Sequence, residues 1–233
     1  MDGLLLVDKP VGFTSHDVVA LVRRRFRLDK VGHGGTLDPA ATGLLVILIG
    51  KATKLSERVM NGDKVYQGTL RLGAETSTQD AEGEILKTGD TSGVTEEKLR
   101  DVLTSFSGDQ YQIPPMVSAI KKDGVTLYKL ARKGEVIERE PRLIHVYSFK
   151  LLNFGVPDSA IEVHCSKGTY VRTLCHDVGA KLGCCGHLAG LRRMKSGKFD
   201  VANAVTVEQL KAMDKAVELE PYVVPIMRAV GEV

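Results

Sequence analysis

The sequence predicts an α+β fold built around a mixed, largely antiparallel sheet flanked by helices. Short apolar runs and alternating apolar and polar stretches, both typical of strands, recur along the chain. Strands and helices do not alternate strictly, which argues against a doubly wound parallel sheet. The 233 residues suffice for a sizeable core, and 43% hydrophobic with 26% charged residues is typical of folded globular proteins.

The first seventy residues contain five expected elements. Leu4–Val7 is predicted to be a buried strand. Ser15 is expected to cap a helix over about 16–27, with apolar residues on one face and arginines on the other. The apolar run Leu44–Ile49 is bounded by glycines and predicts a central strand. Two further elements follow: a short helix near 52–61 and a strand near 64–72.

The middle of the chain is predicted to be more irregular. Residues 73–94 are acidic and rich in turn formers, with one hairpin strand near 84–87. Thr95 is expected to cap a helix whose first turn is acidic. Residues 109–142 resemble a protruding insertion that grips a ligand, because they are basic and flanked by prolines. Ile113–Met116 must be extended there, since proline disfavours helix at the preceding residue, and a short helix is expected near 125–133.

The last third contains clearer patterns. Alternating residues predict strands at 142–153 and 159–165. Three more elements are expected after them: a helix near 169–182, a strand near 187–199 and a helix from Thr206.

Charge is unevenly distributed. The formal net charge is +3, but residues 63–110 hold ten acidic and five basic side chains, so the remainder carries +8. Clustered cations indicate a nucleic-acid footprint when they share a face, and otherwise a solvated helix face. The clusters are Arg23, Arg24, Arg25 and Arg27; Lys121 and Lys122; Arg132 and Lys133; and Arg192, Arg193, Lys195 and Lys198.

Cysteine and hydropathy patterns indicate a cytoplasmic protein without a metal. None of Cys165, Cys175, Cys184 and Cys185 forms a C-x-x-C pair, so buried free thiols are expected. The histidines among them match no zinc spacing. The apolar N-terminal stretch is cut by Asp8 and Lys9, which excludes a signal segment. No apolar run approaches the ~20 residues that a membrane helix needs.

The densest candidate for chemistry is the segment 32–43, in which glycines precede Asp38 and Pro39 follows it. Glycines adopt conformations closed to other residues, and functional groups often lie on such loops beside a rigid strand. The same pattern also fits an ordinary Asp-Pro turn. A phosphate-binding loop is set aside because neither Gly-rich nucleotide fingerprint is present.

Two further segments carry residues suited to a site. In 167–174, a glycine turn leads into a helix bearing Tyr170 and Arg172. An arginine can hold a carboxylate such as Asp38 through two hydrogen bonds, although a surface arginine is the commoner reading. Tyr66 begins a strand, where it fits either a half-buried core position or a platform on which an unpaired base stacks.

Several motifs in this order resemble the TruB family of tRNA pseudouridine synthases over essentially the whole chain. The resemblance rests on the following segments: Lys9-Pro10-x-Gly12-x-Thr14-Ser15; Gly34-Gly35-Thr36-Leu37-Asp38-Pro39-x-Ala41-x-Gly43-x-Leu45; Gly50-Lys51-Ala52-Thr53-Lys54; Lys64-x-Tyr66; Pro114-Pro115-x-x-Ser118-Ala119-x-Lys121; Tyr128-x-x-Ala131-Arg132; Lys167-Gly168-Thr169-Tyr170-x-Arg172; and Leu191-Arg192-Arg193.

The resemblance implies conversion of uridine-55 in the tRNA T-loop to pseudouridine, without cofactor or metal. Asp38 would be the nucleophile and Arg172 would orient it. Tyr66 would stack on the flipped uracil and His33 would fill the space that the base leaves. Tyr170, Leu191 and Lys54 would line the pocket or hold the nucleotide. The partner would be the tRNA T-arm, with a monomer and no obligate protein partner expected.

The chain departs from the family where a C-terminal PUA domain usually follows, and Thr126 and Met194-Lys195 also vary its pattern. We therefore expect one catalytic domain over 1–233, with 109–142 as an RNA-gripping insertion and the PUA domain absent. Three alternatives remain: a non-catalytic RNA-binding or chaperone protein on this fold, a guide-RNA-dependent synthase of the dyskerin type, and an unrelated hydrolase using Asp38.

Overall fold

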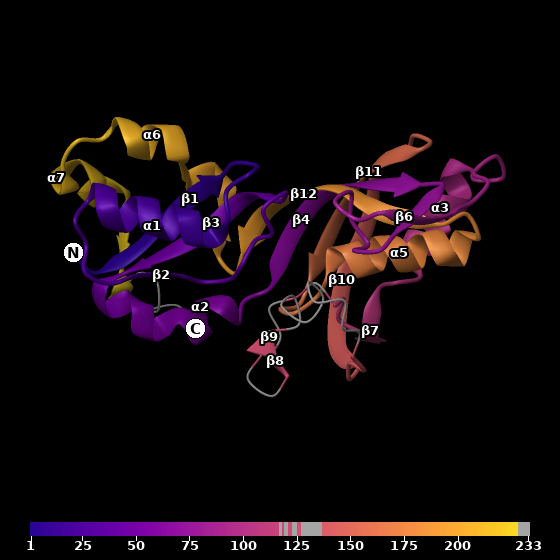
Figure 1. Cartoon of the computed structure of the whole chain (residues 1–233), viewed down its shortest axis with the longest axis horizontal. Helices are drawn as coiled ribbons and strands as arrows, with labels where there is room; N and C mark the ends of the chain where they lie inside the picture. Colours follow the sequence, from indigo (N-terminus) through magenta and orange to yellow (C-terminus); the bar gives the residue numbers. More distant parts are fainter. Residues whose placement is uncertain (117, 119–120, 123–124, 127–136, 228–233) are drawn as a thin grey trace. The chain divides into compact units, whose positions relative to one another are not determined.

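A computed structural model describes residues 1–116, 118, 121–122, 125–126 and 137–227. The chain divides into two compact units (Figure 1). Unit 1 comprises Met1–Tyr66 and Leu191–Val233, and unit 2 comprises Gln67–Gly190. Two strands, β4 (Lys64–Leu72) and β12 (Gly186–Ser196), contain the points where the chain passes from one unit into the other.

The sheet of unit 1 centres on an antiparallel pair, β1 (Gly3–Lys9) and β3 (Thr42–Ile49). The last part of β12 pairs in parallel with the start of β3, so that Arg193 lies opposite Gly43. The strand order is β14-β1-β3-β12. Shorter strands complete the sheet: β2 (Val31–His33), β13 (Phe199–Asp200), β14 (Val205–Thr206) and β15 (Val223–Pro225).

Each face of this sheet has its own core. On one face, α1 (Ser15–Arg25) and α6 (Val207–Ala212) pack against alternate residues of β1 and β3, together with Leu37 and Ala41 (Figure 1). The other face is covered by a short helical segment, η1 (Gly50–Leu55) and α2 (Ser56–Met60), and by residues near the chain's end. Three short turns follow β13: η2 (Val201–Asn203), α7 (Ala216–Leu219) and η3 (Glu220–Tyr222).

The sheet of unit 2 has the order β4-β11-β10-β7. The pairings of β10 (Arg142–Asn153) with β11 (Asp158–Cys165) and with β7 (Gly108–Gln112) are antiparallel. Two helices, α3 (Glu96–Thr104) and α5 (Val171–Leu182), contact each other, and α3 contacts β10 (Figure 1). A hairpin of β5 (Ala74–Thr76) and β6 (Ile85–Thr88) fills the predicted turn-rich stretch. The predicted fold class, α+β with a largely antiparallel sheet, is confirmed.

Some local predictions need correction. The cap of α1 is Thr14, whose side chain accepts from the Asp17 N–H in a capping box, whereas Ser15 is the first helical residue. The predicted helix near 52–61 is a 3-10 segment followed by one α turn. Residues 109–112 belong to sheet strand β7 rather than to a protruding insertion.

The predicted insertion, 109–142, lies only partly within the described residues. Val125–Thr126, the first residues of the predicted helix, form a strand, β9, that pairs with β8 (Lys121–Lys122). The rest of that predicted helix lies outside the described residues. Among the described helices, none is long and apolar enough to cross a membrane.

Candidate active site

The turn between β2 and β3 presents Asp38 to solvent from a fixed backbone. Asp38 is exposed, while Leu37 before it and Ala41 after it are buried in the core of unit 1. The Gly34 N–H donates to the Val46 carbonyl at 2.8 Å, and an added Cβ at Gly34 would lie 2.6 Å from a Val59 methyl. This packing explains the glycine and ties the turn to β3.

Every backbone carbonyl from Gly35 to Pro39 accepts a hydrogen bond. Arg193 donates to the Gly35 and Thr36 carbonyls at 3.1 and 3.3 Å. The Ser15 hydroxyl donates to the Leu37 carbonyl at 3.2 Å and accepts from the Leu37 N–H at 2.9 Å. The remaining donors are the Ala41 N–H to Asp38, the Gly12 N–H to Pro39 and the Lys9 ammonium to Pro39. Because all of these carbonyls are bonded, they hold the turn in one conformation, so the Asp38 backbone is preorganised.

Lys9 is a buried cation beneath this turn. Its side chain is fully buried, and its ammonium donates to the carbonyls of Pro10, Phe13 and Pro39 at 3.0, 2.6 and 3.3 Å. Burial lowers its pKa from 10.5 to about 8; Asp38 raises this pKa and Arg193 lowers it. The three charged groups therefore lie close enough to affect one another.

His33 lies on β2, partly buried, with its ring 5.3 Å from that of His16 in an edge-on arrangement. Burial lowers its pKa, and the neighbouring His16 and Arg193 lower it further. Its buried Nδ1 atom has no hydrogen-bond partner. The neutral form of the imidazole is therefore favoured.

Of the other predicted site residues of unit 1, Tyr66 and Leu191 are partly buried and Lys54 is exposed. Tyr66 and Leu191 pack, partly buried, against the core cluster that includes Leu37 and Ala41. They therefore share with the Asp38 turn one face of the unit 1 sheet. Lys54 is exposed on η1, which contacts β2. Its predicted contact with the nucleotide stays a prediction.

In unit 2 the partner of Arg172 is Asp80, a residue that sequence reasoning missed. Arg172 Nη1 donates to Asp80 Oδ2 at 3.0 Å, and the two side chains are only 6% and 18% exposed. Asp80 Oδ1 also accepts from the Thr78 hydroxyl and from the Glu82 N–H. The sequence signal for Asp80 is a polar run, Ser77 to Asp80, within the acidic and turn-rich stretch 73–94. The predicted pairing of Arg172 with Asp38 joins residues of different units and stays a prediction.

Tyr170 is fixed at the start of α5 by another residue that was not singled out, Gln112 of β7. The Gln112 amide accepts from the Tyr170 N–H at 2.8 Å and donates to the Tyr170 carbonyl at 3.1 Å. The Arg172 guanidinium carbon lies 5.8 Å from the centre of the Tyr170 ring. Unit 2 therefore brings Tyr170, Arg172 and Asp80 together.

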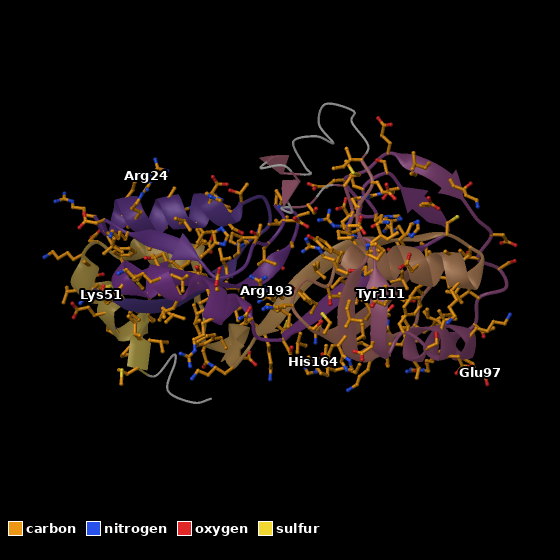
Figure 2. All side chains as sticks on the ribbon, turned by 90° about the horizontal axis from the view of Figure 1, so that it is seen from below. Arg24, Lys51, Glu97, Tyr111, His164 and Arg193 are labelled. Atoms are coloured by element: carbon orange, nitrogen blue, oxygen red, sulfur yellow. The ribbon has the colours of Figure 1, made fainter. Side chains whose placement is uncertain are left out.

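The basic clusters require a correction. Arg193 is 1% exposed and binds backbone carbonyls, so it is not a surface cation (Figure 2). Arg25 donates to the carbonyls of Met213 and Lys211 and pairs with Asp214, so it fastens α6 to α1. Arg23, Arg24 and Arg27 are exposed and remain candidates for phosphate contacts; Figure 2 labels Arg24 among them.

The described residues contain no group of three histidine, cysteine or acidic side chains able to hold a metal ion. All four cysteines are buried free thiols, as predicted. Burial raises the pKa of the Cys175 thiol far above its usual range. Asp38, by contrast, lies exposed on its turn.

An exposed carboxylate on a preorganised turn is the kind of group that enzymes use for nucleophilic catalysis. A model described as "TruB family pseudouridylate synthase (N terminal domain)" matches residues 23–171. A second, described as "tRNA pseudouridylate synthase B C-terminal domain", matches residues 172–231. The chain belongs to the TruB family of pseudouridylate synthases.

Individual relatives agree. The tRNA pseudouridine synthase B of Opitutus terrae is 52% identical over 98% of this chain and 95% of its own. That of Geobacter sulfurreducens is 48% identical over 99% of this chain and 76% of its own. A chain in the crystal structure of a Cbf5-Nop10-Gar1 complex matches with a TM-score of 0.75 and 29% identity over 98% of this chain. This chain spans 61% of that solved chain's length.

Proposed function

We propose that this enzyme converts uridine-55 of the tRNA T-loop to pseudouridine, with Asp38 as its nucleophile. The observation that carries the proposal is the Asp38 turn, whose carbonyls from Gly35 to Pro39 are all bonded while its carboxylate stays exposed. Membership of the TruB family and the names of relatives at about 50% identity support the substrate.

The reaction exchanges one bond for another. The N1–C1′ glycosidic bond breaks, the uracil rotates, and a C5–C1′ bond forms, while C5 loses a proton and N1 gains one. No atom is gained or lost, so the reaction consumes no oxidant or reductant, and we propose that it uses neither cofactor nor metal. Asp38 acts either by forming a covalent intermediate or in a glycal-type mechanism, and in both its carboxylate must reach the flipped nucleotide.

Base flipping comes first, because the reacting atoms lie within the stacked T-loop. Unstacking costs a few kcal/mol. Stacking of the uracil on Tyr66 would return about 1–3 kcal/mol of this. His33, neutral and partly buried, would fill the vacated space, while Leu191, Tyr170 and Lys54 would line the pocket or hold the nucleotide. The packing of Tyr66 and Leu191 on the core beneath the Asp38 turn supports this role.

Arg172 would orient the Asp38 carboxylate. A guanidinium provides five donors in a rigid fork, so it can bind one carboxylate while keeping another. Asp80 holds Arg172 from within unit 2 and fixes where the rest of the fork points. Arg172 is thus buried, charged and preorganised, which suits it to this task.

The test is conversion of an unmodified tRNA transcript by the purified full-length protein without added cofactor. The Asp38→Asn variant is expected to lose conversion by at least about 10⁴-fold, since the nucleophile is removed, while tRNA affinity stays within threefold. Near-normal turnover by this variant would refute the nucleophile. An isolated T-arm hairpin, tested in parallel, is expected to be converted too.

The second candidate, a non-catalytic tRNA chaperone on this fold, predicts tRNA binding without pseudouridine formation. A guide-RNA-dependent synthase predicts conversion only after guide RNA and protein partners are added. We propose instead a cytoplasmic enzyme acting alone, as a monomer, through a single catalytic domain with an RNA-gripping segment within 109–142. Conversion by the isolated chain separates the three possibilities.

A further inference from the structure

We propose that Arg193 is a positioning residue for the nucleophile, holding the Asp38 turn in its reactive geometry. The inference rests on Asp38 being the nucleophile, as proposed above. Arg193 does not need to touch the substrate, and it acts through the backbone that carries Asp38.

The guanidinium of Arg193 joins three points of the chain. Its Nε donates to the Leu44 carbonyl at 2.7 Å, at the start of β3. Its Nη1 and Nη2 donate to the carbonyls of Thr36 and Gly35 at 3.3 and 3.1 Å. One planar group therefore sets the spacing between the strand and the turn that precedes Asp38.

The Arg193 backbone is fixed as firmly as its side chain. In the parallel pairing of β12 with β3, Arg193 lies opposite Gly43. Gly43 has φ +95°, and a Cβ added there would lie 2.3 Å from the Arg193 carbonyl oxygen and 2.8 Å from its nitrogen. The strands therefore approach each other closely at the residue that carries the guanidinium.

Arg193 is a buried cation whose hydrogen bonds go to the backbone of the turn. Arg193 is 1% exposed, and its guanidinium donates to three backbone carbonyls. Burying a cation in this way is costly, and a buried aliphatic side chain would fill the space at lower cost. The rigid, planar guanidinium explains why an arginine stands here. A lysine carries its donors on a single ammonium at the end of a flexible side chain. The site therefore requires the geometry of arginine.

The decisive experiment compares Arg193→Lys with the wild type in single-turnover conversion of a tRNA transcript. The lysine variant keeps the charge but cannot reach all three carbonyls. Its rate constant is expected to fall about 10- to 100-fold, because misplacement of a reacting group by about 1 Å has effects of this size. Its tRNA Kd is expected to stay within threefold of the wild type.

Arg25→Lys is the matched control, since Arg25 also binds two carbonyls but fastens α6 rather than the turn. It is expected to lower Tm without changing the rate constant of the folded protein. A rate for Arg193→Lys within twofold of the wild type, in protein shown to be folded, overturns the proposal. So does an equal loss of rate in Arg25→Lys.

Amide hydrogen exchange of the wild type provides a test that does not depend on a variant folding. The N–H groups of Gly34, Leu37 and Ala41 are expected to be protected nearly as well as those of β3. Free exchange of these amides overturns the proposal. If Asp38→Asn converts tRNA normally, the proposed nucleophile fails; if Asp38→Asn is inactive and Arg193→Lys is normal, only the role of Arg193 fails.

Discussion

Arg172 and Asp80 form a buried ion pair in unit 2, with Nη1 and Oδ2 3.0 Å apart. They are separated by 92 positions in sequence. The turn that carries Asp80 is fixed independently, because the Thr76 hydroxyl donates to the Asp80 carbonyl at 2.6 Å and the Leu188 N–H donates to the Gln79 carbonyl. Asp80 is therefore a rigid anchor for Arg172.

Asp80→Asn is expected to lower both stability and turnover. Removing one partner of a buried pair leaves the other charge poorly compensated and costs about 3 kcal/mol or more. Single-turnover conversion is expected to fall at least tenfold, because Arg172 loses its anchor, with tRNA affinity unchanged. Asp158→Asn is the control, since its pair with Arg71 is about half exposed and contributes only about 0–1 kcal/mol. Equal effects of the two changes on urea unfolding and rate would contradict the prediction.

Gly43→Ala is expected to disrupt the junction of β3 and β12. Its added methyl would overlap the Arg193 backbone, and φ at this position is +95°. We expect a loss of at least about 2 kcal/mol in the free energy of unfolding, from overpacking together with strain. Gly93→Ala, where an added Cβ meets nothing within 4 Å, is expected to be within about 0.5 kcal/mol of the wild type. Urea denaturation of both variants checks this contrast.

Because Lys9 is buried with a lowered pKa, we expect the stability of the protein to depend on pH. Burial lowers its pKa from 10.5 to about 8, so between these values the unfolded chain binds a proton that the folded chain does not. Stability therefore rises with pH across this window. The unfolding free energy of the wild type minus that of Lys9→Met is expected to grow by about 3 kcal/mol from pH 8 to 10.5. A difference that stays flat, or that falls with pH, contradicts the burial of an ionisable amine.

The exposed cations of α1 and the residues after it predict salt-dependent binding. Each phosphate contact contributes about 0.7–0.9 to the slope of log affinity against log salt. Replacing Arg23, Arg24 and Arg27 by glutamine is expected to reduce the slope by about 2. Arg71→Gln, whose side chain is paired with Asp158, is expected to leave it unchanged. An unchanged slope in the triple variant would exclude this surface from the tRNA footprint.

Periodicity identified most of the fold. Strands such as β4, β10 and β11 and the helix capped by Thr95 lie where alternation and capping rules place them. The Ser15 prediction was wrong because Thr14 and Ser15 are both good caps, and the Ser15 hydroxyl bonds to Leu37 instead. Such a choice depends on a contact 22 positions away, which local propensity does not contain.

The site was only partly predictable for the same reason. Asp38 stood out because glycines and a proline mark its turn. Asp80 did not, because carboxylates in an acidic loop are usually solvated. Arg193 was assigned to a surface cluster, since sequence shows that cations are adjacent but not which of them is buried. Only the parallel register of β12 with β3 directs it beneath the turn.

The ribosome makes Asp38 well before it makes Arg193. Asp38 is translated 155 residues before Arg193, the side chain that holds its turn. At about 5–20 residues per second, roughly 8–30 s of elongation separate the two. A nascent chain carries Asp38 throughout that interval without the support beneath its turn. If Arg193 positions the nucleophile as proposed above, a chain still on the ribosome is expected to be inactive until β12 has been made.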